Sequence, residues 1–243
     1  VSQRLGNPIA SKLTGTMYTA HRGTALASGT AGKTLNNQLG YIRAMYNELL
    51  RLEEIDYPNP LANVRMLKLQ ERELSFLSLD QIEILFKSIR ETCVLPHAGM
   101  VAKICLATGC RWGEARDLVP GRVNHGQVTF TNTKSKRTRS VPISKELEKE
   151  ILDHFQIHGP FTRCEPAFDK ALKRSGIKLP KGQSTHVLRH TFASHFMMNG
   201  GNILTLQKIL GHSTVTMTMR YAHLSPDHLR EAIRLGPLNS ASL

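Results

Sequence analysis

The chain has 243 residues, 40% of them hydrophobic, which is enough for a packed core in one large domain or two modest ones. Lysine and arginine outnumber aspartate and glutamate by 13 (32 against 19), and so positive a field attracts polyanions, which favours nucleic acid as partner over a merely basic surface. No run approaches the ~20 apolar residues of a membrane span, and the four cysteines lack the paired spacing of a zinc site, so reduced cysteines in a cytoplasmic protein are expected.

The first third of the chain is predicted to be helical and basic. Thr34 is a candidate N-cap for a helix over 35–54, because apolar residues recur there at i, i+3 and i+4. Two prolines in 57–60 end that helix, since proline lacks a backbone donor and disfavours helix before it. Residues 61–75 are rich in charge and are predicted to be a linker, with a domain boundary near residue 74.

Helical patterning resumes after this boundary. Residues 78–81 (SLDQ) form a start signal for a helix through about Arg90. Further helices are predicted over 97–107 and 114–118.

The pattern then changes to β and back to α. Two short β-prone runs, 127–132 and 138–143, are joined by the basic turn 133–137, which predicts an antiparallel hairpin. From Ser144 onward helices are predicted over about 144–156, 165–175, 186–199, 202–209, 214–221 and 226–234. The expected fold is mainly α with a small antiparallel β-sheet, in two domains: 1–73 and 74–243.

Six side chains in the second domain suit the cleavage of a phosphodiester. Such a reaction without metal needs a nucleophile, cations on the non-bridging oxygens and a proton donor for the leaving oxygen. Arg111 (TGCRWGE) and Arg189 (HVLRH) offer planar donor forks that match phosphate. His186 and His212 can donate hydrogen bonds or exchange protons, and Tyr221, nine positions after His212, is the candidate nucleophile.

The same cations would activate the tyrosine. The pKa of a free phenol is roughly 10, and nearby positive charge is expected to favour the phenolate. A covalent 3′-phosphotyrosyl bond would conserve the energy of the broken linkage, so the DNA could be rejoined without ATP. No metal or nucleotide cofactor is implied.

Lys134 is the candidate general acid for the leaving 5′ oxygen. It lies in the turn of the predicted hairpin, which could reach into the minor groove. Charge alone does not separate it from Lys136 and Arg137, because turns are often basic simply from being solvated.

These motifs resemble those of the tyrosine site-specific recombinases, the phage integrase family. Segments 106–114, 133–143, 186–190 and 210–221 match, in chain order, the family's Arg, Lys, His-x-x-Arg, His and Tyr positions. The resemblance is strong over about 76–225, is weaker over the N-terminal helices, and is most like temperate-phage integrases.

The resemblance implies a DNA strand-exchange enzyme that integrates or excises phage DNA at attachment sites. It implies a C-shaped clamp of two domains around a duplex, with 1–73 as a core-type DNA-binding domain and 74–243 as the catalytic domain. It further implies a tetramer on DNA, strand exchange through a Holliday junction, DNA-bending accessory proteins, and a place in the cytoplasm of a bacterial host, at its nucleoid. A tail segment over 225–243 is a candidate for docking on a neighbouring protomer.

Other readings of the same residues stay open at this point. A lone tyrosine near a helix end is usually a packed aromatic, and His190 and His195 are expected to be core or interface histidines. Glu114 is expected to orient Arg111 rather than act as an acid. A type IB topoisomerase uses similar phosphate chemistry, and a non-catalytic DNA-binding protein could retain the fold.

Overall fold

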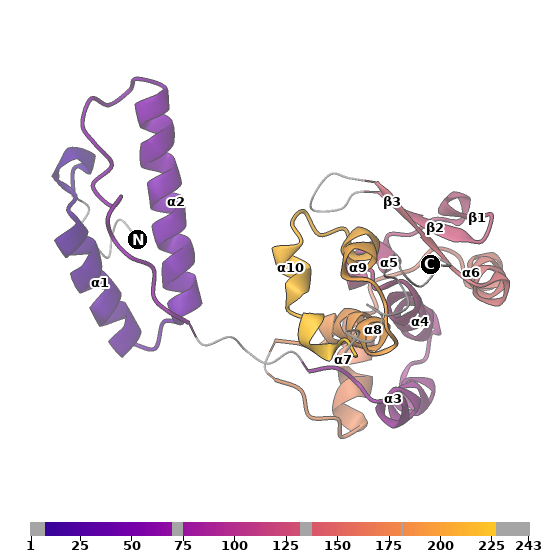
Figure 1. The fold of residues 1–243 in the computed structure, drawn as a ribbon. Helices are drawn as coiled ribbons and strands as arrows, with labels where there is room; N and C mark the ends of the chain where they lie inside the picture. Colours follow the sequence, from indigo (N-terminus) through magenta and orange to yellow (C-terminus); the bar gives the residue numbers. More distant parts are fainter. Residues whose placement is uncertain (1–7, 70–74, 132–137, 181, 227–243) are drawn as a thin grey trace, which may run out of the picture. The chain divides into compact units, whose positions relative to one another are not determined.

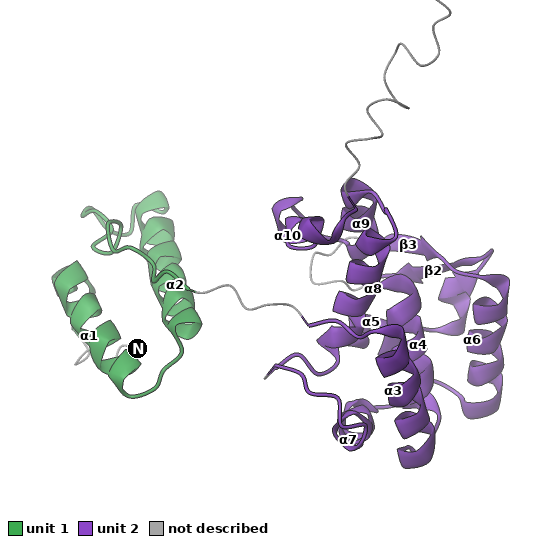
Figure 2. Cartoon of the chain, turned by 60° about the horizontal axis from the view of Figure 1, so that its bottom comes forward, with its two compact units in different colours: residues 1–73 green, residues 74–243 purple. Residues whose placement is uncertain are grey.

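The computed structural model describes residues 8–69, 75–131, 138–180 and 182–226. The chain divides into two compact units, 1–73 and 74–243, coloured separately in Figure 2. Each unit has its own core and is described by itself.

Two helices form the first unit. After the short 3₁₀ turn η2 (Ala10–Lys12), α1 spans Gly15–Ala27 and α2 spans Gly32–Arg51 (Figure 1). Their apolar faces bury a small cluster of side chains: Leu13, Tyr18, Leu39, Tyr46 and Leu61.

The N-cap expected at Thr34 is wrong by three residues. The N-cap is Ala31, which provides no side-chain cap, and Thr34 lies inside the first turn of α2. A Cβ at Gly32 would lie 2.9 Å from Leu69 Cδ2. The start of α2 is therefore closely packed, although no polar side chain caps it.

The first part of the segment predicted to be a linker is bonded to α2 over 61–67. Leu61 is fully buried, and the Arg43 guanidinium donates to the carbonyl oxygens of Leu61, Ala62 and Val64. The Asn36 amide both donates to and accepts from the backbone of Leu67. Charge content misled the prediction here, because the contacts are made by backbone groups.

The second unit starts with three helices. α3 (Leu79–Thr92) begins at the start signal that the sequence predicted. It opens with a capping box, in which Ser78 and Gln81 each accept a hydrogen bond from the other's backbone N–H. It is followed by α4 (His97–Thr108) and the one-turn α5 (Trp112–Arg116). α4 packs against α8 (His186–Met198), and α3 packs against α7 (Glu165–Arg174).

The β-region forms a sheet of three strands rather than the predicted two. After the 3₁₀ turn η3 (Pro120–Arg122), β1 (Val123–Asn124) pairs with β2 (Gln127–Phe130), and β2 pairs with β3 (Arg139–Pro142), all antiparallel. Val128 faces Val141 across the second pair, and both are buried. The two-residue β1 was too short to give a sequence signal.

The remaining helices complete the unit. They are α6 (Lys145–His158), α9 (Ile203–Leu210), α10 (Thr216–Met219) and the 3₁₀ turn η4 (Ala222–Leu224). The predicted helix over 214–221 is therefore cut to four residues, and most of the one predicted over 226–234 lies outside the described residues.

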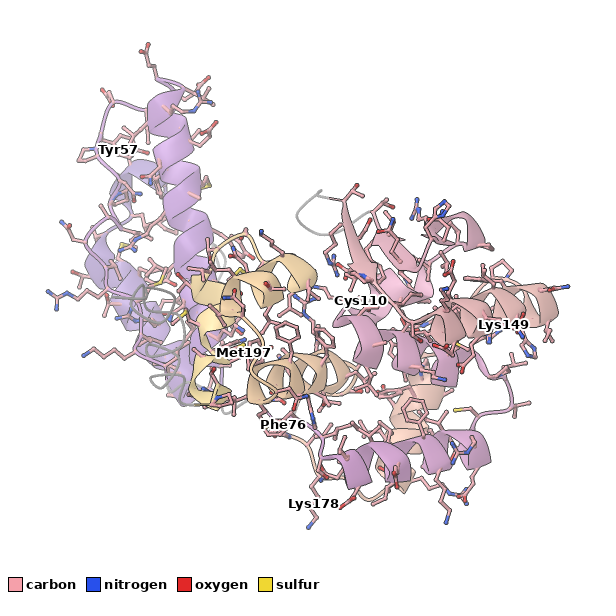
Figure 3. The ribbon with its side chains drawn as sticks, turned by 45° about the vertical axis from the view of Figure 1, so that its right-hand side comes forward. Tyr57, Phe76, Cys110, Lys149, Lys178 and Met197 are labelled. Atoms are coloured by element: carbon pink, nitrogen blue, oxygen red, sulfur yellow. The ribbon has the colours of Figure 1, made fainter. Side chains whose placement is uncertain are left out.

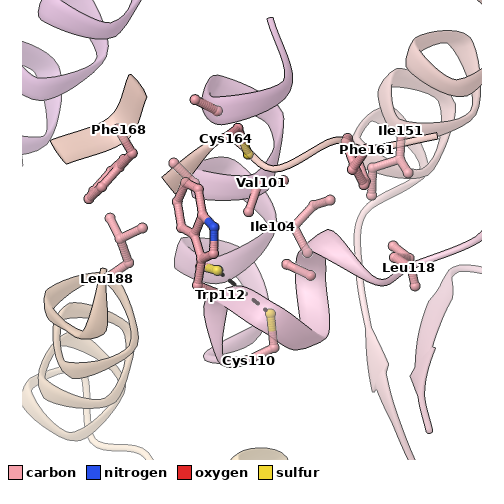
Figure 4. Close-up of a cluster of buried hydrophobic side chains, with 14 of the residues drawn as sticks. Val101, Ile104, Cys110, Trp112, Leu118, Ile151, Phe161, Cys164, Phe168 and Leu188 are labelled. Atoms are coloured by element: carbon pink, nitrogen blue, oxygen red, sulfur yellow. Dashed lines mark hydrogen bonds between the residues drawn. The ribbon is translucent and has the colours of Figure 1, made fainter. Parts of the chain in front are cut away.

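Two apolar clusters hold these helices. The larger one surrounds Trp112, whose ring lies 4.7 Å from that of Phe168 (Figure 4). A smaller one joins α8 and α9 and includes Met197 of α8, labelled in Figure 3, together with the Tyr221 ring. Within the described part of the chain, no helix has the length and apolar character of a membrane span.

Candidate active site

Arg111 is placed by a sharp turn between α4 and α5. α4 ends at Gly109 in the left-handed region (φ 63°), and a Cβ there would lie 2.4 Å from Phe192 Cδ1. Only glycine fits both requirements. Arg111 then begins α5, with a side chain 26% exposed and turned toward Glu114.

Glu114 holds Arg111 at two points. Its Oε1 accepts from the Arg111 guanidinium and its Oε2 from the Arg111 backbone N–H, both at 2.9 Å. Burial alone would raise the pKa of Glu114, but hydrogen bonds and charge from Arg139 and Arg111 outweigh it and lower the pKa to about 2. Glu114 is therefore an anion that orients Arg111, as the sequence predicted.

Arg189 donates hydrogen bonds to the C-terminal ends of α4 and α9. It is 5% exposed, and its two terminal nitrogens each donate at 2.8 Å, one to the Gly109 carbonyl and one to the Leu210 carbonyl. Burial, and then the charges of Arg111 and Arg139, lower the pKa of Arg189 to about 10, so it stays charged at neutral pH.

The two site histidines differ in their surroundings. His186 begins α8, is exposed, and lines an open hollow together with Arg111 and Thr131. His212 follows the left-handed Gly211, and its Nδ1 lies 2.8 Å from Thr218 Oγ1. Burial, and then the charges of Arg189 and Arg111, lower the pKa of His212 to about 4, which makes it neutral at pH 7.

Tyr221 lies at the edge of this group with its hydroxyl buried. The residue is 2% exposed, and its Oη lies 2.7 Å from His190 Nδ1. Burial raises the pKa of Tyr221, and the charges of Arg189 and Arg220 offset this only in part. The cations thus favour the phenolate as expected, but in this conformation loss of solvent outweighs them.

Lys134, the expected general acid, lies outside the described residues, as do its alternatives Lys136 and Arg137. The turn that contains them connects β2 and β3, whose last and first residues, Phe130 and Arg139, face each other in the sheet.

The five described site residues come from four segments of the chain. Charges on some of them shift the pKa values of others. His212 feels the charges of Arg111 and Arg189, and Tyr221 feels that of Arg189. His186 and Arg111 both line the hollow. Among the residues that the structure describes, no group of three or more His, Cys, Asp or Glu side chains is arranged to hold a metal ion.

Two residues of this region were missed by sequence reasoning. Arg139 binds Glu114, and His190, expected in the core, meets the Tyr221 hydroxyl. The only sequence signal for either is its position next to a motif residue.

Comparison with known proteins decides the family. Residues 1–68 match the family model "Phage integrase, N-terminal domain", and residues 162–228 match "Phage integrase family". The chain is 46% identical over 243 residues to the integrase of Escherichia phage 186, an alignment that covers 96% of this chain and 72% of that one. The chain belongs to the phage integrase family. It is thus a tyrosine recombinase, an enzyme of site-specific DNA recombination.

Further relatives agree with this membership. The chain is 49% identical to the integrase of Haemophilus phage HP1 over 207 residues, covering 85% of this chain and 60% of that integrase. The solved catalytic domain of bacteriophage HP1 integrase is 50% identical, with a TM-score of 0.63, covering 70% of this chain and all of that domain. A lambda integrase tetramer bound to a Holliday junction is 19% identical with a TM-score of 0.68 over 86% of this chain and 66% of that one, which shows a shared fold. The mainly helical fold with a small antiparallel sheet, expected from sequence, is confirmed.

Proposed function

We propose that this recombinase cleaves DNA with Tyr221 and holds the scissile phosphate with Arg111, His186, Arg189 and His212. Tyr221 first loses its phenol proton to water, and its oxygen then bonds to phosphorus while the bond from phosphorus to the 5′ oxygen breaks. The departing 5′ oxygen takes a proton from Lys134. A 3′-phosphotyrosyl linkage results, and a 5′ hydroxyl from another strand reverses the step to rejoin the DNA.

The observation that supports this best is the convergence of Arg111, Arg189 and His212 on one region from three separate segments. Arg111 retains partial exposure while Glu114 fixes its position, which leaves part of its donor fork for a ligand. Arg189 adds a buried positive charge behind it. A phosphodiester anion entering this region exchanges water for preorganised donors, which is the main source of stabilisation in phosphoryl transfer.

His212 is suited to donate a hydrogen bond rather than to supply charge. A neutral imidazole keeps one N–H, and in the tautomer in which Nδ1 accepts from the Thr218 hydroxyl that proton lies on Nε2. A neutral donor can bind a non-bridging oxygen without adding a positive charge that would repel the two arginines.

Tyr221 has to change position before it can attack. Its hydroxyl is buried against His190, and burial raises its pKa. The segments on either side, α10 and η4, have four and three residues, and neighbouring side chains such as Met217 and Met219 are half exposed. Short, weakly packed elements move at low cost. Movement of Tyr221 toward Arg189 would reduce the burial of its hydroxyl and bring it nearer to a cation, and both changes lower the phenol pKa.

The wider assembly is also proposed. Double-stranded DNA at attachment sites is the substrate, and 1–73 adds phosphate contacts as a core-type DNA-binding domain while 74–243 is the catalytic domain. The net charge of +13 supports an affinity that is largely electrostatic and falls with salt. Four copies on two sites, DNA-bending accessory proteins and a place in the cytoplasm of a bacterial host complete the proposal for integrating or excising phage DNA.

The direct test replaces Tyr221 with phenylalanine. On a pool of nicked duplexes that contains attachment sites, the wild type is expected to form a covalent protein–DNA adduct and Tyr221→Phe none, while both bind DNA equally by gel shift. Tyr41→Phe is the matched control, because Tyr41 is 74% exposed in the other unit and should leave the adduct unchanged. An adduct of normal yield from Tyr221→Phe would reject the assignment.

A further inference from the structure

The side chain of Arg139 contacts Glu114, the Ile209 carbonyl and the Phe130 ring. It is the first residue of β3, and its side chain is 9% exposed. Its Nη2 donates to Glu114 Oε2 at 2.6 Å and its Nη1 to Glu114 Oε1 at 3.3 Å. Its Nε donates to the Ile209 carbonyl at 2.8 Å, and its guanidinium carbon lies 4.9 Å above the centre of the Phe130 ring.

Burial and these contacts direct Arg139 at protein groups rather than at a phosphate. Three of the five N–H donors of its guanidinium bond protein acceptors, and the side chain is only 9% exposed. Arg111 differs, since it donates to Glu114 through Nη1 alone and is 26% exposed. Arg139 therefore acts on other residues and not on the DNA.

The carboxylate that Arg139 holds is the one that holds Arg111. Each Glu114 oxygen accepts from both arginines: Oε1 from the two guanidinium groups, and Oε2 from the Arg139 guanidinium and the Arg111 backbone. Without the paired fork of Arg139, Glu114 could rotate, and Arg111 would lose its orientation with it.

Arg139 also fixes the chain just before His212. It bonds the Ile209 carbonyl at the end of α9, and a Cβ at Gly211 would come within 3.2 Å of Arg139 Cδ. The stem of Arg139 thus lies along the turn that leads to His212, and α9 lies beside β3 in Figure 1.

We infer that Arg139 is a positioning residue that aligns Arg111, through Glu114, with the chain segment leading to His212. It sets two of the proposed phosphate ligands relative to each other from one buried side chain. The inference rests on the proposed function, since it takes Arg111 and His212 to bind the scissile phosphate.

The test is Arg139→Lys, which keeps the charge and loses the planar fork. Formation of the covalent adduct on a nicked duplex is followed with DNA in excess, where each enzyme molecule reacts once, so that the amplitude reports the folded fraction and the rate constant reports alignment. The rate constant is expected to fall by about 100-fold, as small misplacements of positioning groups do, while DNA affinity changes less than about twofold. Arg174→Lys is the matched control, because Arg174 pairs with Glu91 on the surface of the same unit and its variant should cleave at the normal rate.

A double-mutant cycle asks whether Arg139 acts through Glu114. If it does, adding Arg139→Lys to Glu114→Gln costs much less than it costs in the wild type. Additive losses, or an Arg139→Lys rate within twofold of the wild type, would overturn the inference. If Arg139→Lys gives no folded protein, Glu114→Asp takes its place: slow cleavage with normal affinity supports the alignment, and normal cleavage overturns it.

Failure of the proposed function gives a different result. In that case the wild type forms no adduct at all, whereas failure of this inference alone leaves the wild type active and Arg139→Lys equally fast.

Discussion

The contact between His190 and Tyr221 defines the state of the nucleophile. The two side chains share a hydrogen bond of 2.7 Å, and burial, followed by the charges of His186, Arg220 and Arg189, lowers the pKa of His190 to about 4. A neutral imidazole and a protonated phenol are therefore paired at neutral pH, which is a stable arrangement for two buried polar groups. His190 thus stabilises the buried position of Tyr221.

Removing His190 should expose Tyr221. A buried hydroxyl without its partner is destabilised, so His190→Ala should increase reaction of Tyr221 with a tyrosine-modifying reagent by up to about tenfold. Peptide mass spectrometry can compare it, within one digest, with buried Tyr18 and exposed Tyr41. If Tyr221 in the wild type reacts as readily as Tyr41, the buried position described here is contradicted.

The sequence motifs predicted the proposed phosphate ligands, but not Arg139 and His190, which contact site residues. Arg111, Arg189, His212 and Tyr221 lie in recognisable motifs, and Glu114 was expected to orient Arg111. Arg139 and His190 were missed because their partners lie 25 and 31 positions away in sequence. Such pairings depend on how helices and strands pack, and a single sequence does not encode them as a local pattern.

At the scale of elements, the sequence predicted a helix start correctly where a polar side chain caps the helix. Ser78 begins α3 through a polar cap, so its start was found correctly. α2 begins at Gly32 with no polar cap, and the expected start was therefore misplaced. Residues 61–69 were taken for a linker because they are rich in charge. Their backbone groups bond Arg43 and Asn36, and the sequence of the segment does not show such bonds.

The turn between α4 and α5 is an element-scale feature with a sharp prediction. Gly109→Ala has to strain a left-handed residue and displace Phe192 and Leu210, which together should cost about 2–5 kcal/mol. Its carbonyl also accepts from Arg189, so cleavage should fall with stability.

Urea unfolding followed by the fluorescence of Trp112, the chain's one tryptophan, reports on this unit. Gly121→Ala is the control, because a Cβ there meets nothing within 4 Å and its φ is not left-handed. A Gly109→Ala protein as stable as that control would show that the turn is not constrained as described.

At the scale of the molecule, buried histidines make the second unit sensitive to acid. His97 Nδ1 and His154 Nε2 are 2.9 Å apart, both residues are under 7% exposed, and the ring of His158 lies 5.0 Å from that of His154, tilted by 51°. Burial, then the neighbouring histidines, lower the pKa of His154 to about 4 and also lower that of His97. The unfolded chain binds these protons more readily, so stability is fully present above about pH 6.5 and is lost as pH falls toward 4.

His154→Gln should therefore flatten the pH dependence of unfolding. The glutamine can still pair with His97 but does not titrate, so near pH 5 the slope of unfolding free energy should fall by up to about 1.4 kcal/mol per pH unit. Urea titrations between pH 5 and 7 measure the slope, and His125→Asn, at an exposed histidine, should leave it unchanged. An identical slope in His154→Gln and the wild type would disprove the role given to this pair.

The central claim is that the Tyr221 oxygen becomes joined to a 3′ DNA end. The most direct measurement traps the covalent complex on a random pool of nicked duplexes, digests it with protease and nuclease, and identifies the modified peptide and nucleotide by mass spectrometry. The account predicts one modified peptide, containing Tyr221 linked to a 3′ phosphate. A modified peptide from any other residue, or a 5′ linkage, would contradict it.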